Sequence, residues 1–389
     1  MNIGIITFQR AFNLGAQMQM YALNEFLTGL GHSVVILDYH NPAIDDGYVM
    51  TFNMNKYKKF FRISFIKGVL SFGRDVQIFI LPFNRTKNRK YRSFLHSNFR
   101  FSKRFENKED MPANFDILIT GSDQVWNYCL TAGRKPVYFL DNGDKTNCNI
   151  RKISYAASSE YESFRSLEED KEYICSQLSK FDWISTRERD FSIFLKEKIG
   201  IDATTVLDPT FLLSKESYIK IAKKPNINNY ICVFFVERCK PAHKLAQVIA
   251  KERGLKIIEI GTPRLRASSP SQAFGPEEML GYILYADVVI STSFHGTALS
   301  IIGRKDFYTV YEEPSMRINE LLSIFELNDR LLSDVSQYKQ FKCINYNEDI
   351  IQNIVKRSKN LLIKNLGGEC SNDYRAVRTS GQGVVDSSK

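Results

Sequence analysis

The chain has little from which a metal centre or a disulfide framework could be built. Its 389 residues include only seven cysteines and five histidines. The cysteines are scattered without a C-x-x-C pair, and no two histidines have the spacing of metal ligands. This pattern excludes a zinc ribbon and favours reduced thiols in a cytoplasm. We therefore expect no bound metal and no resident cofactor.

Long apolar runs are missing as well. No stretch of the sequence approaches the roughly 20 apolar residues of a membrane-spanning helix. The first residues also lack the basic region and the cleavage site of a signal peptide. With 43% hydrophobic and 25% charged residues, the composition is that of a soluble globular protein. The length predicts two domains or one large domain.

Acidic residues are nearly absent from one segment. Residues 56–104 contain fourteen Lys and Arg and one acid, Asp75, although the whole chain carries a net charge of only +10. Four interpretations stay open: a solvated charged face, an interfacial membrane anchor, a surface for nucleic acid, and a site for a polyphosphate headgroup. We expect peripheral contact with the inner face of the cell membrane through about 56–104, and no nucleic acid. The apolar residues that favour the membrane are Phe60, Phe61, Phe65, Phe72, Phe79, Leu81, Phe94 and Phe99.

Alternating strand and helix patterns predict an α/β fold with two Rossmann-like domains, whose parallel sheets face a central cleft. The first domain spans 1–215 and has a basic, aromatic insertion at about 40–110. The second spans 216–366, and its last helix, about 348–366, is expected to return to the first domain. We further expect a helix at about 166–180, a linker at 213–229 and a disordered tail at 367–389. The dinucleotide-binding fingerprint G-x-G-x-x-G is absent.

His295 is the most informative single residue. An apolar run of parallel-strand type at 288–290 ends in small hydroxyl residues, and a helix is expected to begin directly after it. His295 lies at this junction, where helix N-termini bind anions and where a histidine can transfer a proton near neutral pH. The alternative is a structural histidine that caps a turn.

Two arginines occupy similar junctions. Arg187 follows the strand expected at 183–186, and Arg317 lies in the first turn of another helix. Each is suited to bind a carboxylate or phosphate, although a surface salt bridge is the usual role of an arginine. Together with His295 they suit a small, doubly charged anion and a proton-transfer step. Asp208 also ends a strand, and a turn at a domain edge is the simpler interpretation there.

Five short motifs, in this order along the chain, resemble the polysaccharide pyruvyl transferase family. The resemblance implies a fold like that of the GT-B glycosyltransferases. It also implies transfer of the pyruvyl group of phosphoenolpyruvate, as co-substrate, onto a sugar as a cyclic ketal, with His295 as the general acid. One position departs from the family, because Ser293 stands where members often carry arginine. The motifs are Gly4–Leu23, Gly121–Asn127, Ile184–Glu188, Asp208–Leu213 and Ser293–Thr297.

Specific residues are expected to bind each substrate. The acceptor would be a galactose-like sugar on a lipid-linked oligosaccharide, in capsule or exopolysaccharide synthesis at the membrane. Two alternatives stay open: a nucleotide-sugar glycosyltransferase on the same fold, and a non-catalytic protein that binds membrane surfaces. The expected donor-binding residues are Arg187, Arg317, Ser293, Gly296 and Thr297, and the expected acceptor-binding residues are Asn13, Gly15, Asp123 and Asn127.

Overall fold

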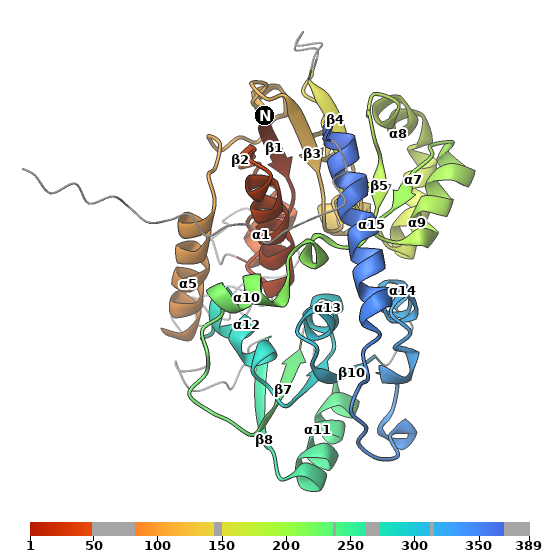
Figure 1. Ribbon diagram of the computed structural model, residues 1–389. Helices are drawn as coiled ribbons and strands as arrows, with labels where there is room; N and C mark the ends of the chain where they lie inside the picture. Colours follow the sequence, from red (N-terminus) through yellow and green to blue (C-terminus); the bar gives the residue numbers. More distant parts are fainter. Residues whose placement is uncertain (49–81, 144–149, 236–238, 262–272, 312–314, 369–389) are drawn as a thin grey trace, which may run out of the picture.

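The computed structural model describes residues 1–48, 82–143, 150–235, 239–261, 273–311 and 315–368. Figure 1 shows two α/β units, one above the other. The sheet of the first unit has four parallel strands in the order β2-β1-β3-β4, and a short parallel pair, β5-β6, continues it through bridges from Ile153 to Trp183 and from Ala157 to Thr186. These strands are β1 (Asn2–Ile6), β2 (Ser33–Ile36), β3 (Ile117–Thr120), β4 (Arg151–Ser154), β5 (Ser185–Thr186) and β6 (Thr204–Thr205).

The second unit repeats this strand order. Its five-stranded parallel sheet runs β11-β10-β9-β7-β8, so the first strand again lies between the second and the third. Strand β9 is buried along its whole length, which explains the apolar run at 288–290. The expected fold class, two Rossmann-like units of GT-B type, is confirmed by this topology. The strands are β7 (Tyr230–Phe235), β8 (Lys256–Gly261), β9 (Val288–Ser291), β10 (Asp306–Val310) and β11 (Leu331–Leu332).

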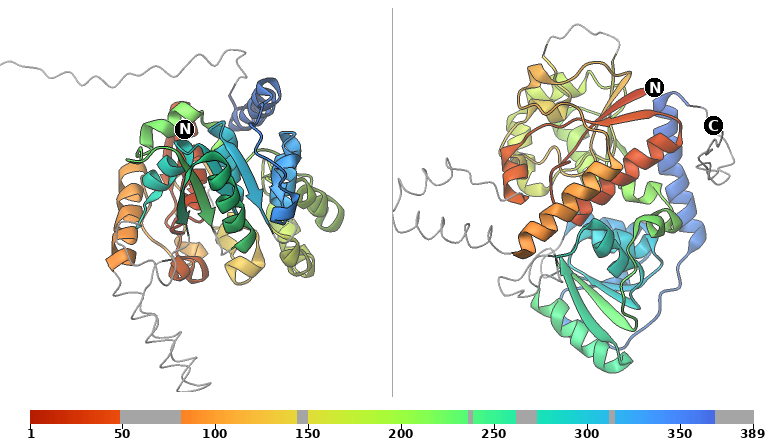
Figure 2. Two further views of the ribbon diagram at one scale, coloured as in Figure 1. Left: turned by 90° about the horizontal axis from the view of Figure 1, so that it is seen from below. Right: turned by 90° about the vertical axis from the view of Figure 1, so that its left-hand side faces the viewer.

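Helices cover the faces of both sheets (Figure 2). Up to residue 221 they are α1 (Leu14–Gly29), α2 (Pro42–Tyr48), α5 (Pro82–Asn98), α6 (Tyr128–Thr131), α7 (Tyr161–Glu169), α8 (Lys171–Leu178), α9 (Arg189–Phe194) and α10 (Lys215–Ile221). After it they are α11 (Lys240–Arg253), α12 (Pro276–Leu284), α13 (Phe294–Ile302), α14 (Met316–Ile324) and α15 (Glu348–Leu366). Short 3-10 helices are η1 (Lys108–Asp110), η2 (Pro136–Phe139), η4 (Pro209–Leu212), η6 (Asn328–Arg330) and η7 (Val335–Gln337), and η3 (Leu195–Ile199) is a π-helix. Within the described residues, no helix is both long and apolar enough to cross a bilayer.

Two sequence-based expectations are wrong in detail. The helix expected at 166–180 is two helices, because the chain leaves helical geometry at Asp170, whose carboxylate binds the Tyr128 hydroxyl at 2.7 Å and Arg134 at 2.8 Å. The linker expected at 213–229 contains helix α10. Its Tyr218 is fully buried and donates a hydrogen bond to the carbonyl of Thr210 at 2.8 Å, which ties this segment to the core.

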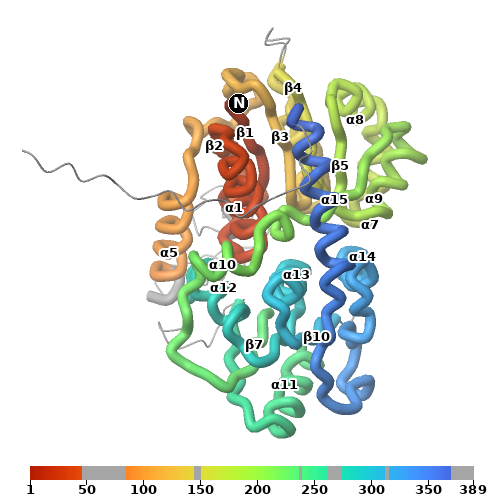
Figure 3. Tube along the Cα trace, in the orientation of Figure 1, coloured from red at the N-terminus to blue at the C-terminus, as the bar shows by residue number. Residues whose placement is uncertain are grey.

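Helix α15 spans both units (Figure 3). At its start, Glu348 pairs with Arg304 of the second unit. Farther along, the Ser358 hydroxyl accepts a hydrogen bond from the Leu207 amide at 3.0 Å, and the Asn365 carbonyl accepts one from Arg151 at 2.7 Å, both in the first unit.

Helix α5 and the residue that follows it place aromatic side chains of the predicted insertion in the core. Phe94 and Phe99 are 2% and 8% exposed, because they pack with Tyr21 of α1. The expectation that these two rings contribute to a membrane anchor is therefore wrong. The other six, between Phe60 and Leu81, and the tail beyond residue 368 lie outside the described residues.

Candidate active site

The site lies where the strand order reverses in both sheets. In open parallel sheets, ligands bind at the carboxyl ends of strands, beside the strands that flank this reversal. Strand β1 leads there into α1 and strand β9 into α13, and Gly15 and His295 are each the second residue of their helix. A Cβ atom at Gly15 would lie only 2.1 Å from Nδ1 of His295. The two units therefore meet at these residues, and only glycine fits opposite the imidazole.

A buried carboxylate faces the other side of the imidazole. Nε2 of His295 lies 3.6 Å from Oδ2 of Asp208, and the two side chains are 10% and 0% exposed. Oδ1 of Asp208 accepts hydrogen bonds from the amide and the hydroxyl of Thr210, at 2.9 and 2.8 Å. Oδ2 accepts one from Ser122 at 3.3 Å. The carboxylate is thus fixed before any ligand binds.

Arg187 completes this buried charge cluster. Its guanidinium donates to Asp208 at 3.0 Å, to Glu188 at 2.7 Å and to the Ser158 hydroxyl at 2.9 Å. Burial lowers the pKa of Arg187, but the adjacent charges of Glu188 and Asp208 outweigh it and raise this pKa. Burial raises the pKa of Asp208, but His295 and Arg187 outweigh that effect and hold it below the usual range. Both groups are therefore charged at neutral pH.

Phe294 connects this cluster to the histidine. The guanidinium of Arg187 lies 4.5 Å from the centre of the Phe294 ring, and that ring meets the imidazole of His295 edge-on at 5.1 Å. A cation over an aromatic face is stabilised by the ring quadrupole, more strongly where water is excluded. Packing therefore holds the imidazole from a third side.

Arg317 faces the same region from the second unit. Its Nε lies 2.5 Å from Oε1 of Glu160, and the Gln124 amide lies 2.8 and 3.2 Å from its two terminal nitrogens, where the amide oxygen can accept. One turn along α14, Glu320 accepts the backbone amide of Arg189 at 2.8 and 2.9 Å. Burial raises the pKa of Glu320 to about 7. Helix α14 is thus attached to the first unit beside Arg187.

The predicted acceptor residues lie on the first unit and have structural partners. Oδ1 of Asn13 caps α1 through the Ala16 amide at 2.8 Å. Oδ1 of Asn127 caps α6 through two amides, at 3.0 and 3.1 Å. Asp123 is half-buried at φ 73°, and its charge helps to raise the pKa of Arg187, which places it near the cluster.

Comparison with known proteins decides the family. The family model described as polysaccharide pyruvyl transferase matches residues 13–314, which is most of the chain. The chain belongs to this family. No curated protein matches the chain.

Several solved structures of sugar-nucleotide enzymes are similar in overall chain course to this pyruvyl transferase family member. UDP-GlcNAc 2-epimerase from Neisseria meningitidis is 10% identical, with 93% of this chain and 91% of that chain covered and a TM-score of 0.44. UDP-GlcNAc 2-epimerase from Methanocaldococcus jannaschii is also 10% identical, with 94% of this chain and 99% of that chain covered and a TM-score of 0.44. An alpha-glucosyltransferase in complex with UDP is 12% identical, with 93% of this chain and 90% of that chain covered and a TM-score of 0.45.

The remaining donor residues predicted for this family member lie at the start of α13. Ser293 is its N-cap residue, and its amide donates to the Ser291 hydroxyl at 3.0 Å. A Cβ at Gly296 would lie 2.3 Å from that same hydroxyl oxygen, so glycine lets the helix approach the sheet. The Thr297 hydroxyl bonds the Ser293 carbonyl at 2.9 Å and the Thr309 hydroxyl at 2.7 Å. Contact of these three with a donor stays a prediction.

Sequence reasoning missed the centre of the cluster. The sequence alone favours a turn at Asp208, and it gives no functional role to Glu188, Ser122 or Glu160. The available signal was that Asp208, like Arg187 and His295, lies within four residues after the end of a parallel strand. Among the residues that the structure describes, no three His, Cys, Asp or Glu side chains are grouped to hold a metal ion.

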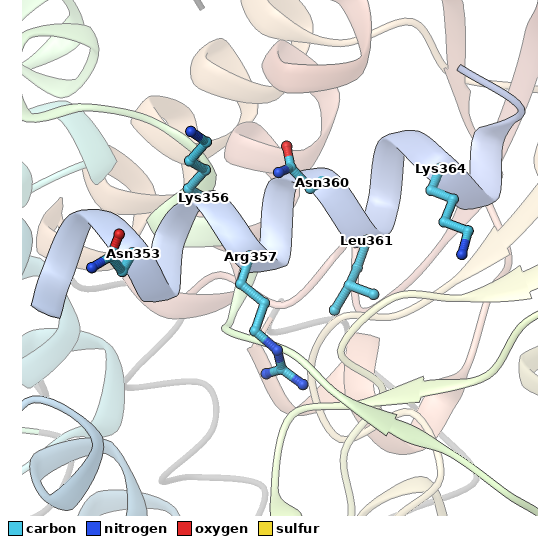
Figure 4. Close-up of a pocket in the computed structure, with 6 residues that line it drawn as sticks. All are labelled: Asn353, Lys356, Arg357, Asn360, Leu361 and Lys364. Atoms are coloured by element: carbon cyan, nitrogen blue, oxygen red, sulfur yellow. The ribbon is translucent and has the colours of Figure 1, made fainter. Parts of the chain in front are cut away.

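A separate surface hollow lies along helix α15. Figure 4 shows its lining side chains, all from this one helix. They share no residue with the cluster around His295, so the hollow and the cluster are different features. The lining residues are Asn353, Lys356, Arg357, Asn360, Leu361 and Lys364.

Proposed function

We propose that the chain transfers the pyruvyl group of phosphoenolpyruvate to two hydroxyls of a galactose-like sugar, as a cyclic ketal. One observation carries the proposal. His295 lies at the junction of the two units, 3.6 Å from a buried Asp208 that is itself paired with Arg187. A histidine beside a fixed carboxylate is suited to hold and deliver a proton near neutral pH. Membership of the pyruvyl transferase family supports the same reaction class.

His295 acts first as the general acid. The charged imidazolium gives its proton to the methylene carbon of phosphoenolpyruvate, whose double-bond electrons form the new C–H bond. The central carbon becomes oxocarbenium-like, and a sugar hydroxyl attacks it and returns a proton to His295. The C–O bond to phosphate then breaks with its electron pair, and the second hydroxyl closes the ketal while its proton leaves with phosphate. Protons and charge balance without a metal or a redox partner.

The donor brings a carboxylate and a phosphate that need positive partners. Arg187 and Arg317 already face Glu188, Asp208 and Glu160, so a bound anion competes with these carboxylates for them. The N-terminus of α13 offers further donors, because the first N–H groups of a helix have no partner within it. Ser293, within the described residues, makes no side-chain cap there. We propose that these N–H groups offset the missing arginine at position 293.

We propose that the acceptor sugar binds on the first unit. Asn13, the N-cap residue of α1, and Asp123, in the loop after β3, are both half-buried, and hydroxyl groups are suitable partners for amide and carboxylate side chains. We propose that this sugar belongs to a lipid-linked oligosaccharide for capsule or exopolysaccharide synthesis.

Phosphate release tests the proposal. The protein is incubated with phosphoenolpyruvate and a series of aryl- or lipid-linked galactosides, and the product is analysed by mass spectrometry. We expect phosphate release together with the mass increase of one pyruvyl ketal. Turnover of a nucleotide sugar with none of phosphoenolpyruvate would replace this proposal with glycosyl transfer.

A further inference from the structure

Helix α5 separates apolar and basic residues on opposite faces. Residues 82–104 contain eight Lys and Arg and no Asp or Glu. Tyr91, Phe94 and Leu95 are buried, and Tyr91 stacks on Phe12 at 5.4 Å. One side of the helix is therefore committed to the core, and its opposite side is open.

The open side carries a row of basic residues, mostly arginines. Arg85, Arg89, Arg92 and His96 are exposed, and their spacings of four, three and four residues place them on one face of a helix. Arg100 continues the row just beyond the helix. We call these five residues the arginine face. Figure 2 shows in its right-hand view that α5 lies on the outside of the molecule.

Some basic side chains of α5 have contacts within the protein, and others have no carboxylate partner among the described residues. Lys90 binds Glu278 of α12 at 2.8 Å, and Lys87 lies over the Tyr91 ring at 5.5 Å. In the described part of the chain, by contrast, no carboxylate pairs with Arg89, Arg92 or Arg100. These three charges contribute little to the fold and remain available to an external anion.

We propose that the arginine face binds the anionic phospholipid headgroups of a membrane surface. Guanidinium groups bind phosphate through paired N–H donors, and a row of cations suits an extended layer of phosphates. Single-stranded nucleic acid would instead need exposed rings for base stacking, whereas Phe94 and Tyr91 point into the core. The proposal is independent of the pyruvyl transfer reaction, because vesicle binding needs no turnover.

Vesicle binding with matched variants tests this surface. The full-length protein is titrated with vesicles of phosphatidylcholine containing phosphatidylserine, and with vesicles of phosphatidylcholine alone. The test variant is Arg89→Gln/Arg92→Gln/Arg100→Gln. The control, Lys240→Gln/Lys244→Gln/Lys251→Gln, removes the same charge from the exposed side of α11, which lies at the far end of the other unit (Figure 1). Circular dichroism checks that both variants fold.

We expect binding to anionic vesicles only, weakened by salt. The test variant should lose roughly 100-fold in affinity, because each basic residue near an anionic surface contributes to binding, and the control variant should lose much less. Three outcomes would overturn the proposal: no binding by the wild type, equal loss in both variants, or an unaffected test variant. Tighter binding to a single-stranded oligonucleotide than to the vesicles, with the same variant dependence, would assign the face to nucleic acid instead.

Discussion

Replacing Asp208 by asparagine is the sharpest perturbation of the buried cluster. The carboxylate receives hydrogen bonds from Thr210, Ser122 and Arg187, and it faces Nε2 of His295 at 3.6 Å. Asparagine has nearly the same shape and its oxygen can keep one set of these bonds. The substitution therefore removes the charge with little change in packing.

Its expected effects differ between stability and catalysis. Breaking a buried ion pair costs about 3–5 kcal/mol. Arg187 keeps Glu188 and Ser158, so we expect a loss near the lower limit, about 3 kcal/mol, within the typical stability of 5–15 kcal/mol. Without the fixed carboxylate, His295 should lose much of the benefit of general acid catalysis, so kcat should fall roughly 100- to 10,000-fold. KM should fall rather than rise, because the anionic donor no longer competes with the charge of Asp208 for Arg187.

The assay measures phosphate release at saturating phosphoenolpyruvate and unfolding by denaturant. Glu348→Gln is the matched control, because it removes a carboxylate from the half-exposed pair with Arg304 and should leave kcat unchanged. A folded Asp208→Asn protein whose kcat stays close to that of the wild type would refute the positioning of His295 by Asp208.

Three further predictions follow from single contacts. Gly15→Ala places a methyl group against the imidazole of His295 and should lower kcat by roughly 100-fold or more in steady-state kinetics. The control, Gly29→Ala in the same helix, meets no atom within 4 Å, so it should leave kcat unchanged and stabilise the fold by up to about 1 kcal/mol in thermal melts. Arg317→Ala should weaken phosphoenolpyruvate binding roughly 10- to 100-fold in calorimetry, and Glu160→Gln, which frees the same guanidinium, should strengthen this binding. Unchanged binding in both variants would exclude Arg317 from donor binding and leave it a structural role between the two units. Burial raises the pKa of Glu320 from 4.5 to about 7, so between these pH values the folded chain keeps a proton that the unfolded chain releases, and the free energy of unfolding should fall as the pH rises. Glu320→Gln should reduce this dependence on pH in denaturant melts, and an unchanged dependence would contradict the raised pKa of Glu320.

Local patterns in the sequence predicted the architecture well. Continuous apolar runs such as 288–290 occur where parallel strands are covered on both faces, so the strands of both units could be recognised. The same logic placed His295 at a strand end. Helix ends held by distant side chains could not be predicted, and the break at Asp170, held by Tyr128 and Arg134, is an example.

The composition of the site depended on contacts across long sequence distances. Asp208 and His295 are 87 residues apart, and nothing local to Asp208 indicates that Arg187 and His295 will face it. A turn was therefore the simplest interpretation. The expectation for Phe94 and Phe99 was wrong for a different reason. The sequence of a basic segment with aromatic residues is the same whether those rings face a membrane or the core of the protein.

Incorporation of solvent deuterium by a His295→Gln variant tests the central claim most directly. In deuterated water, the wild-type protein should release phosphate and place one deuterium in the methyl group of each ketal, because the proton delivered by His295 exchanges with solvent. The control is His243→Gln, which replaces a half-exposed histidine of α11 that pairs with Glu259 of β8, and it should behave like the wild type. We predict that His295→Gln loses ketal formation by roughly 100-fold or more while it still binds phosphoenolpyruvate. Ketal formation at the wild-type rate in His295→Gln would contradict the account.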